Sequence, residues 1–253
     1  MRLRMRVGCA NLPIDQQETD MKDAKLQLDR RDFLQLAAVT AAVGLGSALP
    51  APTANAATGD PTDFTRWLDG ISGKHRMVLD VREPNIGVAM AWAWVYLHTA
   101  PAAYGIKESE LETVMVFRHF AIPLVLGDAA WKKYQLGKVF KIDDPKTNKP
   151  AERNPFYAEA HEPFLPDMAL QKLIDRKVKV VACDMALGFY SNLVAKQMGL
   201  SAEAVLKDWN ATVFPGITHA PSGLVAIQGA VERGCTYVFA GGTEMESFKS
   251  TST

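Results

Sequence analysis

Short runs of apolar and β-branched residues alternate with helix-like segments along most of the chain. The strand-like runs lie at residues 75–81, 113–117, 178–182, 217–219 and 236–240. The helix-like segments lie at residues 87–104, 128–136, 167–176, 184–198 and 223–233, with a further short helix opening at Ser201. Strands that alternate with helices are typical of a parallel sheet covered on both faces. The pattern therefore predicts an α/β fold: a three-layer α/β/α domain at residues 74–241 with a mainly parallel five-stranded sheet.

Two segments depart from this simple alternation. Residues 87–104 are apolar on nearly every face and include Trp92 and Trp94, which predicts a helix that is buried or lies in a subunit contact. Residues 137–164 are polar and rich in Pro, Asn and Lys, and connections of that length are usually functional or mobile. Three further segments are predicted: an insertion at about 127–166, an N-terminal tail at 57–73 with one short helical turn around Phe64, and a C-terminal tail at 242–253.

The N-terminal 56 residues have the pattern of a twin-arginine (Tat) signal peptide. Paired arginines precede an uncharged apolar stretch at 33–49, and a small-x-small cleavage pattern follows it. The residues that form this signal are Arg30, Arg31, Phe33, Leu34, Ala54 and Ala56. The apolar stretch is short and rich in Ala and Gly, which favours a cleaved leader over a membrane anchor. We therefore expect a protein that is soluble after signal cleavage in the periplasm, with the Tat translocase and signal peptidase as export partners. The long leader leaves open whether translation starts at Met1 or Met21.

Composition bounds the mature chain. Removal of residues 1–56 leaves about 197 residues, the size of one ordinary domain. The leader holds seven of the 28 basic and six of the 28 acidic residues, so the remaining net charge is near −1. No basic stripe indicates a nucleic-acid partner. Cys183 ends one predicted strand and Cys235 precedes another, which places them at opposite edges of a parallel sheet and argues against a disulfide.

Polar side chains follow the predicted strands at their carboxyl ends, where open parallel sheets bind ligands. These side chains are Arg82, Glu83 and Asn85 after the first strand, Arg118 and His119 after the second, Cys183 and Asp184 after the third, and His219 in the fourth. Cys183 also begins a helix, and a helix dipole stabilises a thiolate. A strand-end cysteine that is only a small buried hydrophobe is the main alternative.

Other chemistries receive less support from the motifs. Cys183, His119 and His219 have the right types for a metal site, but no two of them are closely spaced. Ser222 is an expected helix N-cap and not a hydrolase nucleophile, because the Gly-x-Ser-x-Gly motif is absent. No dinucleotide fingerprint or phosphate loop occurs. We expect no cofactor, and a metal is only weakly supported.

Four segments carry a resemblance to a known family. The residues VVACDMAL at 180–187, GLSAE at 199–203, PSGL at 221–224 and ERGCTYV at 232–238 resemble the DsrE/DsrF-like sulfur-relay family. The resemblance covers about residues 177–240 and is looser at 75–125. It implies a compact three-layer α/β fold, trimers or hexamers, and a strand-end cysteine, here Cys183, that carries sulfur as a persulfide.

Three functional hypotheses follow. The first is a periplasmic sulfur carrier or acceptor, a possible sulfur-transfer activity rather than a classical turnover enzyme, with a sulfur donor or acceptor protein as partner. In it Cys183, His119, Arg118 and His219 act on sulfur, while Glu83, Asn85, Asp184 and Ser222 bind the substrate. The second is a non-catalytic homo-oligomeric binding or accessory protein in which Cys183 is core. The third is a small metal or redox protein that uses Cys183, His119 and His219.

Overall fold

The computed structural model describes residues 61–160 and 164–241. The predicted signal peptide, including its two arginines and its cleavage site, lies outside the described residues, as does the predicted C-terminal tail. The five-stranded sheet and the helices around it lie within residues 61–160 and 164–241.

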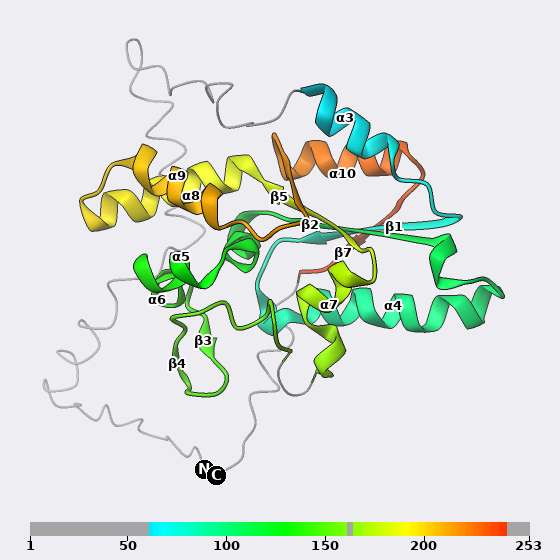
Figure 1. The fold of residues 1–253 in the computed structure, drawn as a ribbon, viewed down its shortest axis with the longest axis horizontal. Helices are drawn as coiled ribbons and strands as arrows, with labels where there is room; N and C mark the ends of the chain where they lie inside the picture. Colours follow the sequence, from blue (N-terminus) through cyan, green and yellow to red (C-terminus); the bar gives the residue numbers. More distant parts are fainter. Residues whose placement is uncertain (1–60, 161–163, 242–253) are drawn as a thin grey trace, which may run out of the picture. The chain divides into compact units, whose positions relative to one another are not determined.

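Five parallel strands form the central sheet, in the order β6-β5-β2-β1-β7 (Figure 1). The strands are β1 (His75–Val81), β2 (Leu111–Phe117), β5 (Lys179–Cys183), β6 (Ile217–Ala220) and β7 (Thr236–Phe239). The strands β1, β2 and β5 are buried along most of their length, as expected for a parallel sheet that is covered on both faces. The predicted three-layer α/β/α fold is confirmed.

Helices cover both faces of this sheet. They are α3 (Pro61–Asp69), α4 (Val88–Tyr104), α5 (Asp128–Lys133), α6 (Leu136–Phe140), α7 (Leu170–Asp175), α8 (Asp184–Met198), α9 (Ala202–Thr212) and α10 (Gly223–Glu232). Figure 1 shows α3 and α10 together on one side of the sheet and α4 on the other. Two apolar cores result: Leu68 and Ala226 pack against Val78, Val116 and Val181 on one face, whereas α4 and α8 pack on the opposite face.

Short 3-10 helices connect several of these elements. They are η4 (Asn85–Gly87), η5 (Glu108–Glu110), η6 (His119–Val125) and η7 (Pro166–Met168). The predicted helix at 167–176 is divided between η7 and α7, because Ala169 between them has an extended backbone. The predicted helix at 128–136 is likewise divided, because Gln135 takes a left-handed conformation with φ 51° between α5 and α6.

The segment predicted as a long loop at 137–164 contains regular structure. It includes most of α6 and a small antiparallel hairpin of β3 (Asp143–Asp144) and β4 (Lys149–Pro150). Phe140, Ala151 and Phe156 from this segment are buried in the core shared with α4 and α8. Buried Asn154 donates to the carbonyls of Leu124 and Leu126. The segment is therefore an integral part of one face of the domain.

The helix α4 carries both buried and exposed apolar residues. Ala89, Ala93 and Leu97 are buried, whereas Trp92 and Val95 are 42% and 45% exposed. Within the described ranges, no helix is long and apolar enough to cross a membrane.

Candidate functional site

Cys183 is the last residue of β5 and the N-cap of α8. Its Sγ accepts a hydrogen bond from the backbone N–H of Ala186 at 3.4 Å. The residue is 6% exposed. α8 has 15 residues, so the positive end of its dipole lies at this sulfur and favours negative charge there.

Arg118, directly after β2, is held by a carboxylate from the neighbouring strand. Its Nε and Nη2 donate to the two oxygens of Asp80 at 2.7 and 2.8 Å. The hydroxyl of Tyr237 on β7 donates to the same carboxylate at 2.8 Å. The hydrogen bonds to Asp80 raise the pKa of Arg118, burial opposes that shift, and the charges of Asp80, Tyr237 and Cys183 add to it. Arg118 is therefore a fixed positive charge within electrostatic range of the Cys183 sulfur.

The first turn of α10 lies against Arg118. A Cβ added to Gly223 would lie 2.9 Å from both Cβ and Cδ of Arg118, so the close approach requires glycine. Ser222 caps this helix, and its Oγ accepts from the N–H of Val225 at 3.2 Å. The structure thus gives Ser222 the predicted N-cap position, and its hydroxyl is engaged there.

Glu83 and His119 form a second cluster, after β1 and β2. Their Oε1 and Nδ1 atoms are 3.9 Å apart, and Glu83 is also 3.5 Å from Nε of Arg82. Burial lowers the pKa of His119 to about 4, and the positive charges of Arg82 and Arg118 contribute to the same shift. Burial raises the pKa of Glu83 against the opposing effect of Arg82. At neutral pH the imidazole is therefore neutral beside a desolvated carboxyl group.

Aromatic side chains close this second cluster. His119 packs edge-on against Phe120 and Tyr190, with ring centroids 4.5 and 6.0 Å apart. Burial also raises the pKa of Tyr190, and the charge of Glu83 adds to that shift. Tyr190 comes from α8, so the helix that begins at Cys183 also contributes to the wall of the Glu83–His119 cluster.

The backbone at this edge of the sheet is strained. Asn85, Ile86 and His119 have φ angles of 35°, 46° and 52°, a region that residues other than glycine rarely adopt. Ile86 is a clear outlier, because a β-branched side chain clashes in this conformation. Such strain concentrates at functional sites, where the surrounding structure imposes it.

His219 pairs with Asp184 and not with Cys183. The Nδ1 atom of His219 lies 2.7 Å from Oδ1 of Asp184, which is buried. In the sheet, His219 is the partner of Ala182, and Ala220 is the partner of Cys183. His219 is therefore held by the carboxylate of Asp184, the residue that follows Cys183.

The predicted candidates therefore fall into three groups at the carboxyl edge. Cys183 lies with Arg118, Glu83 lies with His119, and Asp184 lies with His219. Asn85 lies in the strained turn after Glu83, whereas Ser222 caps α10. Sequence reasoning missed Asp80, Tyr237 and Tyr190 as members of the site. A signal for Asp80 exists, because it is the lone charge among the buried apolar residues that end β1.

The two described cysteines, Cys183 and Cys235, are both free and buried. Burial raises the pKa of Cys235 to about 11, which keeps this thiol protonated and poorly nucleophilic near neutral pH. Across residues 61–160 and 164–241, no group of three or more His, Cys, Asp or Glu side chains is placed to hold a metal ion. Cys183, His119 and His219 do not form such a group.

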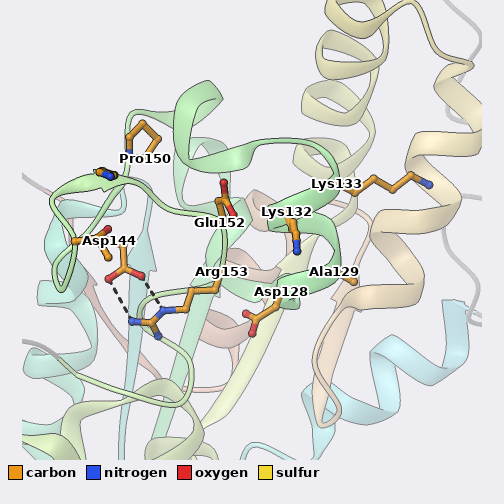
Figure 2. Close-up of a pocket in the computed structure, with 10 residues that line it drawn as sticks. Asp128, Ala129, Lys132, Lys133, Asp144, Pro150, Glu152 and Arg153 are labelled. Carbon is orange, nitrogen blue, oxygen red and sulfur yellow. Dashed lines mark hydrogen bonds and ion pairs between the residues drawn. The ribbon is translucent and has the colours of Figure 1, made fainter.

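An open cavity of about 780 Å³ lies away from the carboxyl edge of the sheet, between α5 and the β3–β4 hairpin (Figure 2). Asp144 and Arg153 form a bidentate pair in it, at 2.7 and 3.3 Å, and Lys133 pairs with Asp208 of α9. These charges are engaged with one another and attach the 127–160 segment to itself and to α9. None of the candidate site residues lines this cavity.

Comparison with known proteins gives no further assignment. No family model matches the chain, and the search of curated proteins finds no match.

Proposed function

We propose that this protein is an exported, DsrE/DsrF-like sulfur carrier in which Cys183 accepts one sulfur atom as a persulfide. The observation that carries the proposal is the position of Cys183: its sulfur caps α8, and Arg118 is its neighbour at the end of the adjacent strand β2. A helix N-terminus and an arginine are the surroundings in which cysteines act as nucleophiles. The predicted signal peptide and periplasmic location remain part of the proposal.

The transfer step needs only a persulfide donor. The Cys183 thiolate attacks the outer sulfur of a donor R–S–SH, the donor S–S bond breaks, and the donor leaves as the thiolate RS⁻. The product is Cys183–S–SH, so one S–S bond replaces another and there is no net oxidation. The reverse step, with a thiolate acceptor, returns the sulfur. Arg118 compensates the negative charge of the Cys183 thiolate before transfer, and that of the persulfide anion Cys183–S–S⁻ once the product has released its proton.

The Glu83–His119 cluster completes the site in this proposal. His119 is neutral at pH 7, and with a pKa of about 4 it is too weak a base to take a proton from a thiol, so in this proposal it serves as a neutral hydrogen-bonding group for the incoming donor. The 6% exposure of Cys183 means that the donor sulfur must enter a nearly closed position. His219 is engaged with Asp184 and takes no step in the transfer.

Sulfur loading tests the proposal directly. The purified mature protein is treated with glutathione persulfide, and its denatured intact mass is measured before and after reduction. We expect the wild type to gain one reducible sulfur, which peptide mapping places on Cys183. Cys183→Ser should gain none, whereas Cys235→Ser, the matched control with the other buried thiol replaced, should load like the wild type. Loading that persists in Cys183→Ser with unchanged circular dichroism would exclude the proposal.

One observation favours a second candidate, a homo-oligomeric binding protein. Trp92 and Val95 are both more than two-fifths exposed and lie three residues apart on α4, so they share one face of the helix. Aromatic residues are enriched in protein interfaces. In this candidate Cys183 is a buried core residue, and its replacement is silent.

A further inference from the structure

Asp80 is a charged residue in the interior of the sheet. It is 1% exposed and lies between Leu79 and Val81, both fully buried. A buried carboxylate is costly unless charged and hydrogen-bonding partners surround it. Asp80 has three such hydrogen bonds, two from Arg118 and one from Tyr237. The central strand therefore places a negative charge where it can fix one guanidinium group.

The geometry of the Asp80–Arg118 contact determines which N–H groups of Arg118 remain available to other groups. Both Nε and Nη2 donate to Asp80, so among the described residues the Nη1 edge of the planar group is the one that Asp80 leaves available. Gly223 allows the aliphatic part of Arg118 to pass under the first turn of α10. Arg118 follows Phe117 and Cys183 follows Ala182, and Phe117 and Ala182 are partners in the register of β2 and β5, so Arg118 and Cys183 are neighbours at the ends of adjacent strands.

We propose that Asp80 is a positioning residue: it fixes the guanidinium of Arg118 so that the remaining edge compensates negative charge on the sulfur of Cys183. Tyr237 supports this arrangement from β7 by holding the same carboxylate. The inference deepens the proposed function and rests on it for the identity of the sulfur adduct. It indicates that the sulfur adduct on Cys183 is held as the persulfide anion, Cys183–S–S⁻, rather than in its protonated form.

Other charged groups near the Asp80–Arg118 contact also affect the charge at the Cys183 sulfur. Arg82 and Glu83 lie at the end of the same strand as Asp80, and Asp184 follows Cys183 on α8. His119 stays neutral above about pH 4, so it adds no charge near pH 7. Arg118 is the group whose own pKa responds to both Asp80 and Cys183. The contact between Asp80 and Arg118 is thus the one that links the central strand to the sulfur.

The test depends on the direction in which Asp80→Asn shifts the pH midpoint of Cys183 alkylation. The rate of alkylation of Cys183 by iodoacetamide is measured against pH in the full mature chain with Cys235→Ser, so that only one thiol reports. If Asp80 acted only through its own negative charge, Asp80→Asn would remove a charge that opposes the thiolate, and the midpoint of the profile would fall. If Asp80 positions Arg118, the same variant releases the guanidinium, and the midpoint rises.

We expect Asp80→Asn to raise the midpoint by roughly one pH unit, in the direction of Arg118→Gln. Tyr237→Phe, which removes only the third hydrogen bond, should raise it less. A midpoint that falls or stays unchanged in Asp80→Asn while Arg118→Gln raises it would overturn the positioning role.

Where Asp80→Asn fails to fold, two other variants decide the matter. They are Tyr237→Phe and Arg118→Lys, the second of which keeps the charge and loses the two-pronged contact, and both must raise the midpoint. Alkylation requires no sulfur donor, so a failure of sulfur loading leaves this test intact and counts only against the proposed function.

Discussion

At the scale of single residues, strain and altered protonation coincide at one place. His119 combines a left-handed backbone, a pKa lowered to about 4 and ring contacts with Phe120 and Tyr190. The adjoining turn after β1 contains the strained Asn85 and Ile86. A conformation of this kind costs of order 1–3 kcal/mol per residue and persists only where packing imposes it. The carboxyl edge of β1 and β2 thus brings together three non-glycine residues with a positive φ, whereas elsewhere in the described backbone such residues stand alone.

The neutral state of His119 gives a signed prediction for stability against pH. In the unfolded chain this imidazole binds a proton below its ordinary pKa of 6.5, whereas in the folded protein it does so only below about 4. Between these values the unfolded state holds more protons, so the free energy of unfolding falls as pH falls. The full shift corresponds to a ceiling of about 3 kcal/mol, reduced by the partial exposure of the side chain.

Urea unfolding of the wild type and of His119→Asn at pH 4.5, 5.5 and 7 measures this contribution. Asparagine tolerates the left-handed backbone and does not titrate. We expect the wild type to lose stability relative to His119→Asn as pH falls from about 6.5 towards 4. Glu83, whose pKa is raised, is present in both proteins and cancels in the difference. Two curves that run parallel over this range would show that His119 is not buried as a neutral base.

At the scale of elements, the 127–160 segment behaves as part of the domain and not as an appended loop. Gly137 in α6 shows how closely it packs, because an added Cβ would overlap the backbone nitrogen and carbonyl oxygen of Ala151. Backbone atoms cannot move aside as a flexible side chain can. Gly188 in α8 differs, because an added Cβ meets nothing within 4 Å.

This contrast predicts opposite effects of the same substitution. Gly137→Ala should lower the free energy of unfolding by about 2 kcal/mol or more, since it overpacks a fixed contact. Gly188→Ala should raise it by up to about 1 kcal/mol, because alanine is the better helix former. Thermal and urea unfolding of both variants measure the two effects. Wild-type stability in Gly137→Ala would show that the hairpin separates readily from α6.

The elements also show how far sequence patterns reach. The helix at 184–198 was predicted with the bounds that the structure has, because Cys183 and Gly199 mark its two ends by local cap geometry. The division between α5 and α6 was not predicted, because the left-handed Gln135 leaves no sequence signal. The contact of Asp80 with Tyr237 was also missed. It depends on β7 pairing with β1, and the strand order of a sheet does not follow from alternation along the chain.

At the scale of the whole molecule, the resemblance implies trimers or hexamers, and α4 offers an apolar surface for such an assembly. The sequence predicts that this helix is buried or lies in a subunit contact. Its inner face is buried within the chain, while Trp92 and Val95 remain exposed on its outer face. Burial of a tryptophan of this size in an interface contributes substantially to association.

We therefore expect residues 57–253 to form a homo-oligomer through α4. Native mass spectrometry and light scattering over a range of concentrations measure the assembly, and Trp92→Glu should shift it to smaller species with unchanged circular dichroism. Leu200→Glu is the matched control, because Leu200 is 45% exposed but lies in the turn between α8 and α9. A wild type that is monomeric at every concentration, or an assembly that Trp92→Glu leaves intact, would contradict the α4 interface. If Trp92→Glu dissociates the assembly and sulfur loading on Cys183 persists, each subunit contains a complete site. If loading is lost together with assembly, the subunits must associate for Cys183 to react, because the variant changes no residue of the carboxyl edge.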